Sequence, residues 1–80
     1  MIFLVEYDRL AGRILTFAVF EDSERSQAAD RRLEIELALN GAGINHEVVL
    51  LDAASEEALR RTHRRYFESP SEIVKSTSTE

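Results

Sequence analysis

The sequence contains no cysteine and no tryptophan, and it has only one proline and three glycines in 80 residues. Without cysteine the chain can form no disulfide bond, thiolate zinc site or cysteine nucleophile, which fits the expectation of a reducing cytoplasm. A chain of this size buries only about 60% of the surface that it exposes when unfolded. The sequence therefore predicts one domain with a thin core, for which oligomerisation is a natural remedy.

Long apolar runs and an excess of positive charge are also missing. The longest uninterrupted apolar stretches, residues 2–5 and 48–51, are too short to cross a bilayer or to form the core of a signal peptide. The formal net charge of −5 argues against a whole surface that binds nucleic acid, since such binding depends on neutralising phosphates. We therefore expect a small soluble protein with no membrane partner, in which only a local basic patch could contact nucleic acid.

The hydrophobic pattern predicts a small α+β domain with the element order ββαβα. Residues 2–8 and 13–20 are rich in β-branched and aromatic side chains, which predicts an N-terminal antiparallel hairpin with Gly12 available for a positive φ. Residues 46–52 contain a continuous run of four apolar residues, which predicts a third strand at the centre of the sheet. A right-handed crossover would make this third strand parallel to the second.

The segment LEIELAL, residues 33–39, fits either a strand or a helix. Its apolar and polar residues alternate as in a half-buried strand, yet Leu, Glu and Ala favour helix. Polar residues upstream can cap a helix over about 24–40, with Asn40 and Gly41 at its end, so we predict helix. Such a helix has two apolar stripes on nearly opposite sides. One stripe contains Ala29, Leu33 and Leu37, and the other contains Ala28, Ile35 and Leu39.

The last part of the chain predicts a second helix and a tail. Ser55 can cap the helix, and Glu56 and Glu57 in its first turn complement the helix dipole. Ser69 and Pro70 predict its end. The domain is therefore expected to span residues 1–70, and residues 71–80 are expected to form a flexible polar tail, because from residue 75 onward no apolar side chain is present to be buried.

Acidic residues stand at the ends of all three predicted strands, where carboxylates could hold a magnesium or manganese ion. The stretch ADRRLEIELAL followed by HEVVLLD resembles the ribonuclease-H-like pattern of an acidic helix before a strand that ends in Asp. The resemblance implies a metal-dependent nuclease whose ligands would be Glu34 or Glu36, Asp52 and Asp8. The predicted topology instead puts Asp8 and Asp52 at opposite ends of the sheet, about 20 Å apart. We therefore assign these acids to turns, caps and surface charge, and expect no metal site.

Basic residues cluster in LRRTHRRYF, residues 59–67. The candidates for contact with nucleic acid or with an acidic protein are Arg60, Arg61, Arg64, Arg65 and Tyr66. Acidic residues stand four positions before Arg60 and Arg61, however, in the orientation that favours ion pairs within a helix. We therefore expect a salt-bridged helix face, with nucleic-acid binding as the alternative. His46 and His63 lack the spacing of metal motifs, and no phosphate loop or nucleophile elbow is present, so no catalytic residue or cofactor is predicted.

The stretches FLVEYDRLAGRI and LLDAASEEALRRTHRRYF resemble short bacterial hypothetical proteins with no assigned activity, and this resemblance transfers no functional residue. The excess of apolar surface is more informative, because the first helix has two apolar stripes and the hairpin is apolar on both faces. We expect a non-enzymatic interaction domain that forms a symmetric homodimer or binds another protein. The residues expected to mediate self-association are Ala28, Ile35 and Leu39.

Overall fold

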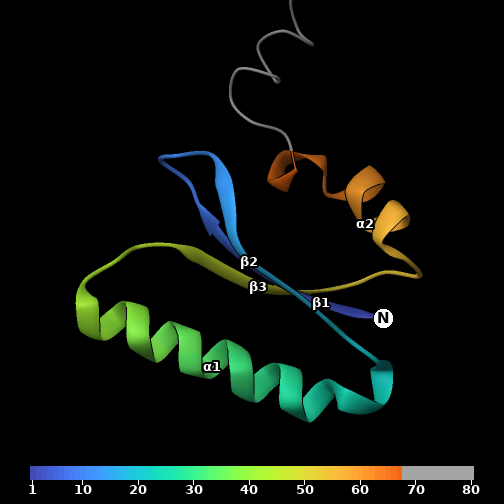
Figure 1. Cartoon of the computed structure of the whole chain (residues 1–80), viewed down its shortest axis with the longest axis horizontal. Coiled ribbons are helices and arrows are strands. Elements are labelled where there is room, and N and C mark those ends of the chain that lie inside the picture. The colour runs from blue at the N-terminus through green and yellow to red at the C-terminus, as the bar shows by residue number, and fades with distance from the viewer. Residues whose placement is uncertain (68–80) are drawn as a thin grey trace, which may run out of the picture.

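The computed structural model describes residues 1–67, which form a three-stranded sheet between two helical layers (Figure 1). The strands are β1 (Ile2–Asp8), β2 (Arg13–Phe20) and β3 (Glu47–Asp52). The helices are α1 (Arg25–Ala42) and α2 (Glu56–Thr62), with 3-10 turns η1 (Asp22–Glu24) and η2 (Arg64–Tyr66). The predicted α+β class and ββαβα order are confirmed. The predicted tail, residues 71–80, lies outside the described residues.

The strand order is β2-β1-β3 with both pairs antiparallel, so β1 is the central strand. The prediction that residues 46–52 form the central strand is therefore wrong. Their apolar run has a different cause, because helical segments cover both faces of the sheet out to the β3 edge and leave only Asp52 of this strand exposed. Since β2 and β3 are both antiparallel to β1, they run parallel to each other, as the crossover rule predicted.

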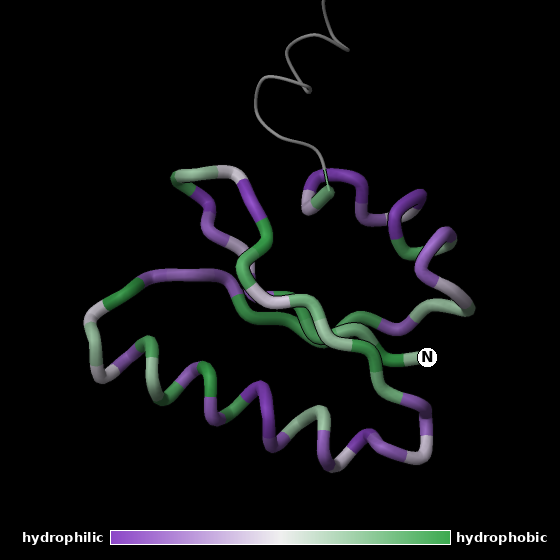
Figure 2. The backbone as a smooth tube through the Cα atoms, in the orientation of Figure 1, coloured by the Kyte–Doolittle hydropathy of each residue, from purple (hydrophilic) through white to green (hydrophobic). Residues whose placement is uncertain are grey.

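Strand β1 is buried on both faces. Its residues 2–5 have no exposed surface, and Figure 2 shows that hydrophobic residues concentrate in the strands between two more hydrophilic helical layers. Glu6 lines a cleft beside Ile35 of α1, so the alternation of side chains places Val5 and Tyr7 on the opposite face, toward η2. There the ring of Tyr66 meets the ring of Tyr7 edge-on, with centroids 5.2 Å apart. Two small cores therefore share one strand.

The ambiguous residues 33–39 lie inside α1, so the helix prediction is confirmed. The helix continues past the predicted end, because Gly41 is helical and Gly43 is the residue that adopts a left-handed φ of 70°. The Gly43 N–H donates to the C=O of Asn40 at 3.2 Å, and the next N–H, of Ile44, donates to the C=O of residue 39 at 2.9 Å. These two bonds form a Schellman motif, which requires the left-handed residue at position 43.

Alanine substitutions at Gly41 and Gly43 are expected to change the free energy of unfolding in opposite directions. We expect Gly43→Ala to lower the free energy of unfolding by about 1–2 kcal/mol, because an L side chain is strained in the left-handed region. We expect Gly41→Ala to raise it by about 0.5–1 kcal/mol, because alanine is favoured inside a helix. A Cβ at either position meets no atom within 4 Å, so packing does not differ between them. Urea denaturation measures both changes, and two changes of the same sign would contradict this helix end.

Helix α2 ends earlier than predicted, at Thr62. Ser55 caps it as expected, since its hydroxyl accepts from the N–H of Ala58 at 3.1 Å. The hydroxyl of Thr62 then donates back to the C=O of Ala58 at 3.0 Å, and His63 leaves the helical conformation with φ −124°. The turn η2 follows and directs Tyr66 onto the sheet, where it is 6% exposed. The break therefore allows an aromatic side chain to close the second core.

The described residues form a thin slab whose Cα atoms span 42 × 33 × 11 Å. The smallest dimension corresponds to three strands spaced about 4.8 Å apart. The radius of gyration is 14.0 Å, whereas a compact domain of 67 residues would have about 11 Å. Both sheet edges and the sides of both helices therefore lie close to the surface.

Candidate functional site

Helix α1 uses one apolar stripe for the core of its own chain and leaves the other exposed. The inner stripe contains the residues predicted for self-association, namely Ala28, which is fully buried, and Ile35 and Leu39, which are half-buried. On the other side Ala29 is exposed, and Leu33 and Leu37 are 55% and 63% exposed. We name Ala29, Leu33 and Leu37 the outward stripe. The structure thus places the predicted residues against the sheet and makes the opposite stripe the candidate for contact with a partner.

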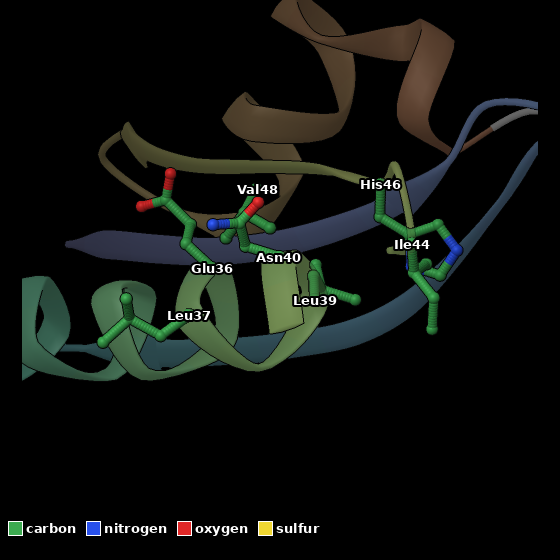
Figure 3. A pocket seen from close by; sticks show the side chains of 7 residues that line it. All are labelled: Glu36, Leu37, Leu39, Asn40, Ile44, His46 and Val48. Carbon is green, nitrogen blue, oxygen red and sulfur yellow. The ribbon is translucent and has the colours of Figure 1, made fainter. Parts of the chain in front are cut away.

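One residue of the outward stripe, Leu37, lies at the rim of a cleft between α1 and strand β3 (Figure 3). A cleft of about 340 Å³ lies between the C-terminal half of α1 and β3. Its lining residues are Glu36, Leu37, Leu39, Asn40, Ile44, His46 and Val48. Leu37 belongs to the outward stripe and Val48 to the strand, so the cleft connects one end of the stripe with β3. At the other end of β3 the guanidinium of Arg25 donates to Asp52 at 2.6 Å, which holds this flank of α1 along the strand.

Strand β3 has an open edge, because β1 is its only neighbour within residues 1–67. Met1 and Ala53 exchange both of their backbone hydrogen bonds, at 3.0 and 3.1 Å, just beyond the strand pair. Hydrogen-bonded pairs alternate along an antiparallel ladder, so the backbone groups of Val48, Leu50 and Asp52 point away from β1. These groups form a template for a further strand. We name this edge together with the outward stripe the association surface.

The other edge strand, β2, is less suited to pairing. Its register with β1 shifts between Glu6 and Tyr7, so that Leu15 has no partner and lies in a bulge. A bulge twists a strand and interrupts the ladder that a further strand would follow. The register of β3 with β1 is regular from residue 47 to residue 52. Of the two edges, β3 is therefore the one that can accept another strand.

A polar cluster lies on the α1 face of the sheet and joins β1 and β2 to the residue before β3. His46 Nδ1 lies 2.8 Å from Glu6 Oε2, and the hydroxyl of Thr16 donates to Glu6 Oε1 at 2.8 Å. The other imidazole nitrogen of His46 lies 3.8 Å from Asp8 Oδ2. Both oxygens of Glu6 are thus engaged, and His46 is held between two carboxylates. Glu6 and Thr16 were not predicted as site residues, although a Glu inside an apolar strand and a Thr directly opposite in the hairpin were the available signal.

An ion-pair cluster centred on Glu47 lies on the α2 face. The hydroxyl of Tyr66 and the guanidinium of Arg65 both donate to Oε2 of Glu47, the latter at 2.7 Å, and Arg9 donates to Oε1 at 3.2 Å. The hydrogen bond from Tyr66 is the main cause that lowers the pKa of Glu47. Burial, followed by the hydrogen bond to Glu47, raises the pKa of Tyr66. This cluster anchors η2 to the start of β3.

The structure brings the predicted nucleic-acid contacts together on α2 and η2. They are Arg60, Arg61, Arg64, Arg65 and Tyr66. The predicted ion pairs within the helix are confirmed, with 3.0 Å between Arg60 and Glu56 and 3.2 Å between Arg61 and Glu57. Arg65 pairs with Glu47 and lies over the ring of Tyr66. Because Tyr66 is 6% exposed, its ring is closed to stacking by a base.

The carboxylates that the ribonuclease-H resemblance implies are engaged with arginines or lie apart. Asp52 stands opposite Ile2 in the β1–β3 ladder, whereas Asp8 ends β1 at the far end, so the predicted separation is confirmed. The ion pairs are Arg31 with Glu34 at 3.3 Å, Arg32 with Glu36 at 3.0 Å, and Arg25 with Asp52 at 2.6 Å. Within residues 1–67 no three His, Asp or Glu side chains are arranged to hold a metal ion.

A scan against protein-family models and searches of curated proteins and of solved structures found no match for this chain. In the part of the chain that the structure describes, no helix combines the length and the apolar character needed to cross a membrane. The association surface combines an exposed apolar stripe with an open strand edge, and it is the candidate functional site.

Proposed function

We propose that this chain is a self-association module, a non-enzymatic domain that works as a symmetric homodimer through the association surface. The observation that carries the proposal is the outward stripe, in which Leu33 and Leu37 each expose more than half of their surface on a helix that packs over the open-edged strand β3. Single exposed leucines are common, but a continuous apolar patch marks an interaction site. Helix α1 is an outer layer of the described fold, and no other segment of residues 1–67 covers this patch (Figure 1).

The charges along α1 favour a second copy of the same helix as the partner. Three arginines and one aspartate lie before Leu33, which gives this half a net charge of +2. Two glutamates and no basic residue follow Leu33, which gives the other half a net charge of −2. In an antiparallel pair the basic half of each helix lies over the acidic half of the other. A two-fold interface needs only one such self-complementary patch.

Light scattering at micromolar concentration tests the proposal. The wild-type chain is expected to give about twice its mass of 9.1 kDa. The double variant Leu33→Glu with Leu37→Glu is expected to give the monomer mass with an unchanged circular dichroism spectrum, because both side chains are exposed in the single chain but would be buried as charges in the dimer. The matched control is Leu10→Glu, at a 99% exposed position in the β1–β2 turn, and it should remain dimeric. A monomeric wild type or a dimeric double variant would contradict the proposal.

A further inference from the structure

We infer that the dimer is built on strand pairing, in which β3 of one copy pairs antiparallel with β3 of a second copy about a two-fold axis at Leu50. The two sheets then form one continuous sheet of six strands. This pairing presupposes the self-association proposed above, and it adds the segment that makes the contact and its register.

The backbone groups at the open edge select the register. Only residues whose N–H and C=O point outward can form the hydrogen-bonded pairs, and these are Val48, Leu50 and Asp52. With the axis at Leu50, Leu50 pairs with itself and Val48 pairs with Asp52 of the second copy, so that all three residues are used. A shift by two residues in either direction leaves one outward residue of each copy without a partner. The register centred on Leu50 therefore forms the most hydrogen bonds.

The same register keeps like charges apart. The charged residues of β3 are Glu47 and Asp52, one at each end of the strand. With the axis at Leu50, Asp52 lies opposite Val48 and Glu47 lies opposite Ala53 of the second copy. No two carboxylates face each other, and each is already paired with an arginine of its own chain. Strand edges that resist pairing carry lysine, proline or a bulge, and β3 has none of these.

Helix α1 lies on the side of the sheet where this contact forms. It packs mainly over β3 and β1, so a two-fold axis at the β3 edge brings both copies of α1 to the same face of the joined sheet. Glu36 lines the cleft beside β3 and pairs with Arg32 at 3.0 Å, which places both side chains on the flank that meets the second copy. In an antiparallel helix pair Arg32 can bind Glu36 of either chain. Charge complementarity between the helices and strand pairing are therefore compatible with one two-fold axis.

Amide hydrogen exchange on the full chain, followed by NMR, tests the strand pairing. In the wild-type dimer the amides of Val48, Leu50 and Asp52 should exchange at least about tenfold more slowly than in the Leu33→Glu, Leu37→Glu monomer. The amides of Val49 and Leu51 point toward β1 and serve as the control within the same strand, since they should be protected in both. A dimer in which the three outward amides exchange as fast as in the monomer overturns the strand pairing and leaves self-association intact, whereas a monomeric wild type overturns both.

The register of the β3–β3 pair can be tested separately, by intermolecular NMR contacts in the wild-type dimer. Residues 49 and 51 form the non-hydrogen-bonded pairs across the new interface, where Cα atoms lie about 4.5 Å apart. In a sample that mixes isotope-labelled and unlabelled wild-type chains, an intermolecular contact between the Hα protons of Val49 and Leu51 is therefore expected. A contact of Val49 with Val49, or of Leu51 with Leu51, would overturn this register. Intermolecular contacts confined to α1 would overturn the strand pairing.

Discussion

Replacing Phe3 by alanine is expected to lower the free energy of unfolding by about 3–5 kcal/mol. Phe3 lies in the central strand with no exposed surface, and its ring packs against that of Phe17 with centroids 5.8 Å apart. The cost includes lost burial and the cavity that remains, because the side chains around a deleted ring relax only partially. A single core in a chain this small rarely supplies more than about 3–5 kcal/mol, so the variant is expected to be largely unfolded.

Urea denaturation followed by circular dichroism measures this loss at one fixed chain concentration, since self-association would make stability depend on concentration. Leu10→Ala is the matched control, because Leu10 is 99% exposed and its loss should change the free energy of unfolding by less than about 0.5 kcal/mol. Phe3→Leu should fall between the two, because leucine fills part of the space. A Phe3→Ala variant as stable as the wild type would contradict the central position of β1.

The order of the strands could not be predicted from apolar runs. Residues 2–5 and 48–51 look alike in the sequence, yet one run lies in the central strand and the other at an edge. The reason is that apolar content reports how well the faces of a strand are covered, whereas strand order depends on which backbone edges are paired. Since α1 packs over β3 as well as β1, an edge strand here is almost as apolar as the central one.

The segment 33–39 could be predicted as helical, because its capping residues and the downstream glycines are local signals. Which apolar stripe of α1 faces the sheet was not a local property. Both stripes contain three apolar residues, and only the packing of the sheet decides that Ala28 is buried and Leu33 exposed. The pairing of Glu6 with Thr16 likewise depends on the register of the hairpin, which the bulge at Leu15 shifts. The elements of the candidate site were thus predictable, but its orientation was not.

Replacing Glu47 by glutamine is expected to lower the free energy of unfolding by about 1–3 kcal/mol near neutral pH. The side chain of Glu47 is 13% exposed, and its carboxylate accepts from Tyr66, Arg65 and Arg9. Glutamine keeps the size of the glutamate side chain and one acceptor oxygen, so the loss of stability reports mainly the contribution of the negative charge. The hydrogen bond from Tyr66 lowers the pKa of Glu47 in the folded chain. Its stabilisation is therefore complete above the unfolded pKa of about 4.3 and is lost as the pH falls through the lower folded pKa.

The difference in stability between wild type and Glu47→Gln, measured by urea denaturation from pH 7 to pH 3, isolates this contribution. The backbone N–H of Ala11 lowers the pKa of Asp8 as well, but Asp8 is present in both proteins and cancels in the difference. The difference should shrink as the pH falls, because protonated Glu47 is neutral like glutamine. Glu57→Gln is the matched control, since its side chain is 85% exposed and its pair with Arg61 should contribute less than about 1 kcal/mol. A difference for Glu47→Gln that stays constant down to pH 3 would mean that the anchoring of η2 to β3 does not depend on the carboxylate charge.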